Sequence, residues 1–229
     1  MDEFKRKFVQ NFIDDHRYRY LFDGLKVTLQ IAICAVILGV ILGFIVAIIR
    51  STHDKTGKLK FLNFIAKVYL TVIRGTPVLV QLMISYYVIF TAPDVSKVFV
   101  AVMAFGVNSG AYVAEIVRSG IMSIDNGQFE AGRSLGFNYV QTMIFIILPQ
   151  AFKNVLPALS NEFIVLLKET SVAGYIGIED LTKGGDIIRS RTFEALFPLI
   201  AVACIYLVIV MILTFLVSRL ERRLRNSDH

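Results

Sequence analysis

The feature that most constrains this chain is a set of long apolar stretches that carry almost no charge. In the clearest, Leu25 to Ile49, Lys26 is the only acidic or basic side chain. The hydrocarbon core of a bilayer requires about 20 consecutive apolar residues from a spanning helix. The chain is also 55% hydrophobic and contains no tryptophan, which is unusual for a soluble domain. These stretches predict an all-α, polytopic membrane protein.

Five transmembrane helices are predicted within a single transmembrane domain that covers residues 1–229. The expected spans are residues 25–49, 78–90, 98–117, 147–167 and 195–217, with a helix over residues 61–73 before the second span. That helix should break from the span because Pro77 lacks an N–H and disfavours helical geometry at Thr76. Pro157 is expected to kink the fourth span. Residues 119–139 are too polar to cross the membrane.

Basic residues gather at two places beside the predicted spans. One is the loop that contains Arg50, Lys55, Lys58 and Lys60, and the other is the C-terminal tail from Arg219 to Arg225. Five spans place both segments on one side, which the positive-inside rule makes cytoplasmic, with the N-terminus outside. The five Lys and Arg residues before residue 20 oppose this orientation, although acids are interleaved with them. Membrane flanks, rather than nucleic-acid binding, thus explain the net charge of +6.

Small residues form a smooth ridge along the first predicted span. Ala35, Gly39, Gly43 and Ala47 recur every fourth residue, so they share one face of the helix. Helix association in lipid depends on close contact of this kind, so packing against a second helix is the favoured interpretation. A pore lining is the alternative.

The two cysteines, Cys34 and Cys204, lie within apolar runs and have no His or Cys at metal-ligand spacing. They are expected to be small buried hydrophobes, and no metal site is predicted. No cleavable signal peptide is visible, so the first span is expected to direct insertion.

The most specific motif lies between predicted spans three and four. It reads Glu130-Ala131-Gly132, then Gly136, and then Ile146, Leu148 and Pro149. This resembles the EAA motif of the permeases of binding-protein-dependent ABC importers, and it departs from that motif only at Gly132, where the family has alanine. In that family the motif helix docks on the ATPase. The resemblance therefore implies that residues 119–139 form a cytoplasmic coupling segment and that Glu130, Ala131, Gly132 and Gly136 couple this chain to an ATPase subunit.

The residues of the motif also have a physical meaning of their own. Ala131 and Gly132 should present a nearly bare helix surface, and Gly136 should end or bend the helix. Such a helix can seat in a cleft of a partner and transmit a rigid-body motion. The alternative is an ordinary amphipathic surface helix.

Three further segments narrow the family. They are Val72–Leu82, which contains Arg74-Gly75-Thr76-Pro77, then Ala111–Gly120, and Leu167–Val172. They are similar to the corresponding parts of permeases for polar amino acids, of the histidine, arginine and glutamine type. The resemblance implies a type I ABC importer permease that moves an L-amino acid, polar or basic, by alternating access. It also implies a location in the bacterial cytoplasmic (inner) membrane.

Energy for transport has no visible source in this chain, which contains no Gly-x-x-x-x-Gly-Lys-Ser/Thr phosphate loop. The chain is therefore expected to be a transport subunit without a cofactor and not an enzyme, with ATP and Mg on a partner. The resemblance implies two ATPase subunits, a second permease subunit that is identical or homologous, and an extracytoplasmic amino acid-binding protein. A channel, an ion-coupled secondary transporter and a purely structural membrane subunit are the alternatives.

Polar residues inside the predicted spans are candidates for solute binding, because a charge at the bilayer centre costs about 2.5–3.5 kcal/mol. Asn161 and Glu162 in the fourth span could receive an ammonium or guanidinium group. The alternative, weighted equally, is an internal salt bridge from Glu162 to Lys153, Lys168 or Arg74.

Two more candidates flank the predicted break. Arg74 and Thr76 could bind a carboxylate, because a helix break frees backbone groups. A gate or a pairing role between helices is the alternative. Glu115 and Arg118 stand three residues apart and are expected to form a local ion pair.

Overall fold

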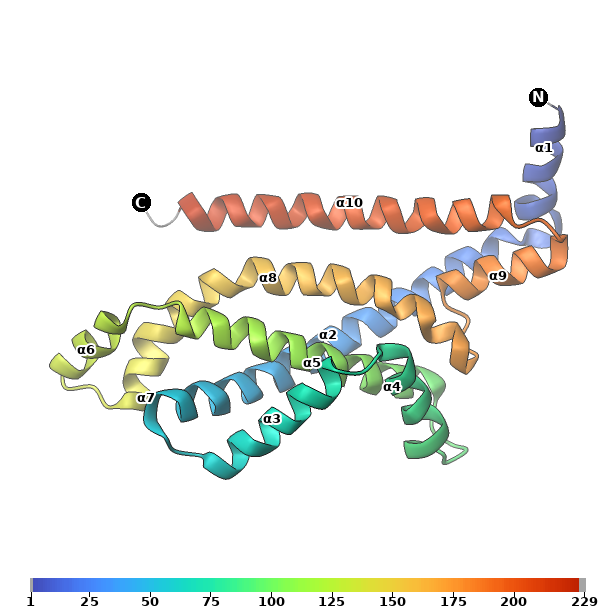
Figure 1. Cartoon of the computed structure of the whole chain (residues 1–229). Helices are drawn as coiled ribbons and strands as arrows, with labels where there is room; N and C mark the ends of the chain where they lie inside the picture. Colours follow the sequence, from blue (N-terminus) through green and yellow to red (C-terminus); the bar gives the residue numbers. More distant parts are fainter. Residues whose placement is uncertain (1, 227–229) are drawn as a thin grey trace.

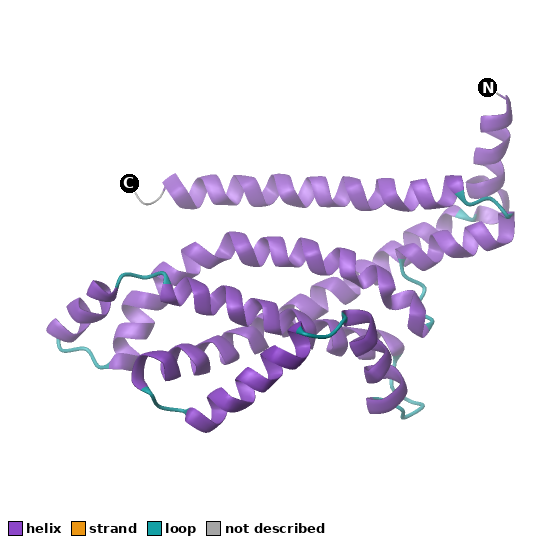
Figure 2. Ribbon diagram, viewed as in Figure 1, coloured by secondary structure: helices purple, strands orange, loops and turns teal. Residues whose placement is uncertain are grey.

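The computed structural model describes residues 2–226, and all of its regular structure in that range is helical (Figure 2). The α-helices are α1 (Asp2–Phe8), α2 (Tyr18–Thr56), α3 (Lys60–Arg74), α4 (Val78–Ile84), α5 (Lys97–Met122), α6 (Asn126–Ser134), α7 (Tyr139–Thr142), α8 (Leu148–Glu169), α9 (Leu181–Thr192) and α10 (Leu196–Asn226). Short helical segments join them: η1 (Val9–Ile13), η2 (Asp14–His16), η3 (Ser85–Ile89), η4 (Met143–Ile147) and η5 (Thr170–Ile176).

Four helical stretches in the described residues are long and apolar enough to cross a membrane. They are Tyr18–Thr56, Lys97–Met122, Tyr139–Ile176 and Leu196–Arg223. A fifth candidate is the pair formed by α3 and the continuous α4–η3 segment, which are bent by 107° at the Gly75–Pro77 break. The chain is thus an all-α protein with several spans. The helices also run beyond the apolar cores that the sequence marks, since α2 ends only where Gly57 adopts a left-handed conformation with φ of 68°.

The helices α2 and α5 pack together along most of their length and form the centre of the bundle (Figure 1). The ridge of α2 lies at this contact, and all four of its residues are buried. A Cβ atom on Gly43 would clash with the side chain of Val113 of α5, and one on Gly39 would lie 3.0 Å from Ser109. The packing interpretation of the ridge is therefore confirmed. On the other side of α5 lies α8, and α10 lies along α8 and α9.

The two ends of the bundle differ in what they carry. The N-terminal arm and α9 lie at one end, whereas α6, the turn between α2 and α3, and the end of α10 lie at the other (Figure 1). Lys55 of α2 donates a hydrogen bond to Asn126 of α6 at 2.6 Å and lies 4.8 Å from the ring centroid of Phe129. The basic loop and the motif helix therefore share one end.

The expectation that both cysteines are buried is wrong, because the side chains of Cys34 and Cys204 are exposed on α2 and α10. Their neighbours Ile33 and Leu207 are exposed as well, at 48% and 58%. Burial inside the protein is not required of an apolar side chain whose surroundings are lipid tails, because the tails are equally apolar.

Candidate functional site

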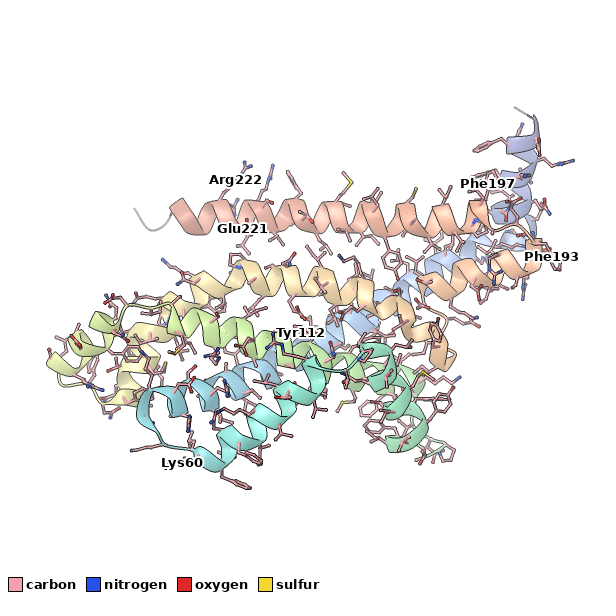
Figure 3. The ribbon with its side chains drawn as sticks, viewed as in Figure 1. Lys60, Tyr112, Phe193, Phe197, Glu221 and Arg222 are labelled. Carbon is pink, nitrogen blue, oxygen red and sulfur yellow. The ribbon has the colours of Figure 1, made fainter. Side chains whose placement is uncertain are left out.

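A groove of about 490 Å³ opens on the bundle between the end of α3, the second half of α5 and the middle of α8. Its lining includes Arg74, Tyr112, Glu115, Ser119, Asn154 and Glu162. Figure 3 labels Tyr112 on the near face of the bundle, beside the end of α3. The groove thus brings two of the predicted site residues, Arg74 and Glu162, to one place.

Glu162 is the buried acid of this groove, with 9% of its surface exposed. Its carboxylate accepts a hydrogen bond from the Oγ atom of Ser109, in the middle of α5, at 3.0 Å. The donor is a neutral hydroxyl. Among the described residues, Glu162 forms no ion pair with Arg74, which binds Glu115 instead, and none with Lys168. A carboxylate whose hydrogen-bond partner is a neutral hydroxyl can accept a cation from a ligand.

Asn161 lies elsewhere on α8. Consecutive residues of a helix point about 100° apart, and the side chain of Asn161 is exposed and is not among the residues that line the groove. The structure therefore does not bring Asn161 and Glu162 together as the sequence suggests.

Arg74 is held at the groove by α5. Its Nη1 atom lies 3.5 Å from Oε2 of Glu115, and its guanidinium lies 5.6 Å from the ring centroid of Tyr112. Glu115 also binds Arg118 at 2.6 Å, so the predicted local pair is confirmed. Arg118 reaches Asp54 of α2 at 3.5 Å. These ion pairs connect α2, α3 and α5.

The break between α3 and α4 is closed by the side chain of Gln81, a residue that sequence reasoning missed. Its Nε2 atom lies 2.8 Å from the carbonyl oxygen of Ile73 and 3.1 Å from that of Thr76. Its Oε1 atom accepts a hydrogen bond from Asn108 of α5 at 2.9 Å. Such side chains satisfy the backbone groups that a broken helix frees within a membrane. An amide in each of two apolar stretches could have identified Gln81 and Asn108.

Thr76 belongs to this break rather than to the groove. Its hydroxyl donates to the carbonyl oxygen of Val72 at 2.8 Å and accepts from Gln81 at 2.8 Å. The hydroxyl is thus already engaged, and Thr76 is not among the residues that line the groove.

The motif helix α6 begins at Asn126 and is capped by Asp125, whose side chain accepts a hydrogen bond from the backbone N–H of Gly127 at 2.7 Å. It ends at Ser134, and Gly136 follows with φ of 80°. The N–H of Phe137 then returns to the carbonyl oxygen of Gly132 at 3.0 Å. This is the glycine-dependent helix end that the sequence predicts.

The expectation that Gly132 lies on the exposed surface of α6 is wrong. Glu130 and Ala131 are exposed, but Gly132 is buried against α7. A Cβ atom on Gly132 would lie 2.6 Å from Cγ2 of Thr142. Gly132 therefore serves the packing of α6 on α7 and presents no bare surface to a partner. The same contact explains why glycine stands where the motif has alanine.

The helix α8 connects α6 with the groove. Gln150 on α8 lies 3.3 Å from Gln128 on α6, and Asn154 lies 3.3 Å from Ser123 at the end of α5. Asn154, Ala158 and Glu162 follow at intervals of four and all line the groove, so they share one face of α8. Movement of α6 can thus reach Glu162 through a single helix.

Within residues 2–226, no group of three or more His, Cys, Asp or Glu side chains is placed to hold a metal ion.

Comparison with known proteins gives a consistent result. Residues 39–226 match the family described as binding-protein-dependent transport system inner membrane component. The arginine transport system permease protein ArtQ of Bacillus subtilis is 39% identical over 211 residues, which are 91% of this chain and 94% of that protein. The glutamine transport system permease protein GlnP of Escherichia coli is 41% identical over 166 residues, or 71% of this chain and 76% of that protein.

A solved structure described as an amino acid ABC transporter with histidines shares the fold. Its matching chain superposes with a TM-score of 0.83 and 41% sequence identity, over 93% of this chain and 98% of that one. The likeness thus extends over nearly the whole of both chains.

Proposed function

The chain belongs to the binding-protein-dependent transport system inner membrane components, and from this premise we propose that it carries a polar or basic L-amino acid into the cell as the permease subunit of an ATP-driven importer. As a member of this family, it is a transport component of the inner membrane and not an enzyme. Its relatives include permeases named for arginine and for glutamine. The family thereby disfavours a channel or an ion-coupled secondary transporter.

The proposed topology has five spans, with α3 and α4–η3 together forming the second. The end of the bundle that carries α6, the basic loop and the C-terminal tail is cytoplasmic, and the N-terminal arm lies outside. The charge pattern supports this orientation, because Arg50, Lys55, Lys58 and Lys60 lie at the same end as α6.

The proposed coupling surface is the exposed side of α6 with Glu130 and Ala131, and it docks on a separate ATPase subunit. Gly132 and Gly136 act on this surface indirectly, since one seats α6 on α7 and the other ends the helix. ATP and Mg bind the partner. The complete importer contains two ATPase subunits, two permease subunits, identical or homologous, and an extracytoplasmic binding protein.

The proposed solute site is the groove, with Glu162 as the group that receives the ammonium or guanidinium of the amino acid. Arg74 lines the same groove and supplies a cation for the carboxylate. Its bond to Glu115 is 3.5 Å long, so an incoming carboxylate can compete with Glu115 for the guanidinium. Asn161 and Thr76 are proposed as supporting residues only, outside the direct contacts.

The observation that carries this proposal is the continuous face of α8, because it joins the anchorage of α6 at Gln150 to the buried carboxylate of Glu162. A motion that the ATPase imposes on α6 tilts α8 and changes access to the groove.

The test is ATP hydrolysis by the reconstituted complex of permease, ATPase and binding protein, measured with each protein amino acid in turn. Stimulation by arginine, lysine, histidine or glutamine, together with uptake that requires ATP, is the expected result. Uptake that continues without an ATPase subunit would instead identify a channel or a secondary transporter.

A further inference from the structure

The N-terminal arm, defined as residues 2–13 of α1 and η1, lies across the direction of α10 at the end of the bundle away from α6 (Figure 1). Since α10 is a candidate span, a helix that crosses its direction at one end runs along the membrane surface. Helices in this position usually place an apolar face in the acyl boundary and a basic face among the headgroups.

An aromatic stripe lies on the side of the arm that faces α10. Phe4, Phe8 and Phe12 recur every fourth residue, and the rings of Phe8 and Phe12 are 5.2 Å apart. The ring of Phe4 lies 5.2 Å from that of Phe197. Phe197 belongs to the first turn of α10 and is labelled in Figure 3. The stripe therefore lies at the level where α10 begins. Phe12 is buried, but Phe4 and Phe8 remain 66% and 44% exposed, so the protein itself leaves their apolar surface uncovered.

Two contacts fix the arm to the rest of the chain. Lys7 forms an ion pair with Glu194 at 3.3 Å, and Asn11, which is fully buried, accepts a hydrogen bond from the hydroxyl of Thr192 at 2.9 Å. The arm is thus held in one orientation, with its aromatic stripe at the start of α10.

The cations that precede Lys7 have a different environment. Among the described side chains, Lys5 and Arg6 take part in no ion pair, and both line an open depression of about 630 Å³ with Val9, Gln10 and Asp14. Asp14 is the one acid in this described lining, so the depression carries net positive charge.

We propose that the N-terminal arm binds an anionic phospholipid of the membrane surface at which it lies, with the phosphate on Lys5 and Arg6 and the acyl boundary against Phe4 and Phe8. The charge complements the phosphate and the uncovered aromatic stripe complements the acyl region. A partner protein would match the cations equally well, but it would not explain an aromatic stripe turned toward the start of a spanning helix. This inference does not depend on the transported solute or on the ATPase.

Because the chain contains no tryptophan, the fluorescence of a single introduced tryptophan can test the proposal directly. In Phe4→Trp, the introduced indole is the sole tryptophan of the permease. The purified permease is placed in nanodiscs that contain a fixed fraction of brominated phosphatidylglycerol or, separately, of brominated phosphatidylcholine. We expect blue-shifted emission that both lipids quench. Phosphatidylglycerol should quench at lower mole fraction, because each of two cations favours anionic lipid by about fivefold.

The charge requirement is tested by Lys5→Gln/Arg6→Gln in the Phe4→Trp background, which should abolish the difference between the two lipids. The matched control, Lys58→Gln/Lys60→Gln, removes the same charge at the other end of the bundle and should preserve the difference. Phe8→Trp reports on the same stripe if Phe4→Trp folds poorly.

Emission typical of indole in water, without quenching by either lipid, would overturn the proposal, as would equal quenching by both. Emission that shifts only when the binding protein is added would assign the arm to a protein partner and would overturn it as well.

Discussion

Gly132 of α6 lies so close to Thr142 of α7 that a Cβ atom on the glycine would stand 2.6 Å from Cγ2 of the threonine. The contact sets the angle at which α6 leaves the bundle, because α7 continues through η4 into α8. Gly132 thus acts from inside the fold, and its neighbours Glu130 and Ala131 form the exposed surface of α6.

The first prediction concerns this contact. Gly132→Ala should reduce solute-stimulated ATP hydrolysis, because the added methyl group must displace α7, and overpacking of this kind costs about 1–3 kcal/mol. The double variant Gly132→Ala/Thr142→Ala removes the obstructing atoms and should recover much of the activity. Equal activity of the single variant and the parent would show that the distance between α6 and α7 has no influence on coupling.

The second prediction concerns the break at the start of α4. Gln81→Met leaves the carbonyl groups of Ile73 and Thr76 and the amide of Asn108 without their partner. Asn108 is buried and the bond to the carbonyl oxygen of Ile73 is partly buried. Each such group that loses its partner costs about 1–3 kcal/mol, so the Tm in detergent should fall by several degrees. Gln30→Met is the matched control, since Gln30 is an exposed glutamine on α2, and its Tm should hardly change. A fall of equal size in both variants would contradict this role of Gln81.

Local features of the fold could be predicted from the sequence, and contacts between distant residues could not. The break at Gly75–Pro77 depends on the chemistry of proline, and the Glu115–Arg118 pair depends on spacing within one helix. The bond from Ser109 to Glu162 joins residues 53 positions apart, and that from Asn108 to Gln81 joins residues 27 apart. Which face of α6 Gly132 occupies depends in the same way on where α7 lies.

Burial was the least predictable property of this sequence. In a soluble protein an apolar run indicates a core, but the side chains of α10 are mostly exposed although the helix is strongly apolar. Cys204 on this helix and Cys34 on α2 follow the same pattern. The sequence identifies such residues as apolar, and only the packing of the helices decides whether protein or lipid surrounds them.

The third prediction concerns pH and Asp180, which is fully buried at the N-terminus of α9, outside the candidate spans. Burial raises the pKa of this carboxyl from 3.8 to about 6, although the backbone N–H groups of Lys183 and Thr182 oppose the rise. The folded state therefore holds the proton more tightly than the unfolded state does. The stability that protonated Asp180 contributes to the fold is fully present below pH 3.8 and is lost as the pH rises through about 6.

Asp180→Asn keeps a residue that caps helices well and removes the charge. The free energy of unfolding of the variant should therefore exceed that of the parent by a margin that grows between pH 4 and pH 7, up to about 3 kcal/mol. Thermal unfolding in detergent measures this margin. Asp186→Asn is the control. Hydrogen bonds from Lys183 and Arg189 lower the pKa of Asp186, so the small contribution of this carboxylate to the stability of the fold is lost as the pH falls. A difference between Asp180→Asn and the parent that stays constant across the range would refute the prediction.

The fourth prediction concerns the solute. Glu162→Gln keeps an acceptor for Ser109 and removes the charge, so arginine and lysine should stimulate ATP hydrolysis only at concentrations roughly 10- to 100-fold higher, as expected when a charged hydrogen bond is lost. Assembly of the complex, followed by size-exclusion chromatography, should be unchanged. Asn161→Ala is the control on the same helix, and it should have a much smaller effect because Asn161 does not line the groove. Unchanged kinetics of Glu162→Gln for arginine, histidine and lysine would remove Glu162 from the solute site.

The fifth prediction tests which end of the bundle meets the ATPase. Cys34 and Cys204 are exposed and must first be replaced by serine. In that background, Ala131→Cys places a thiol on the exposed side of α6, whereas Phe193→Cys places one at the opposite end, where the native side chain is 95% exposed. A bifunctional thiol reagent should join Ala131→Cys to the ATPase subunit and leave Phe193→Cys free of it. In intact cells, a membrane-impermeant thiol reagent should label Phe193→Cys alone. The pair of variants is decisive because the two thiols lie on one chain at opposite ends, so labelling of Ala131→Cys from outside would invert the orientation of the whole bundle and would place the motif helix beyond the reach of any cytoplasmic ATPase.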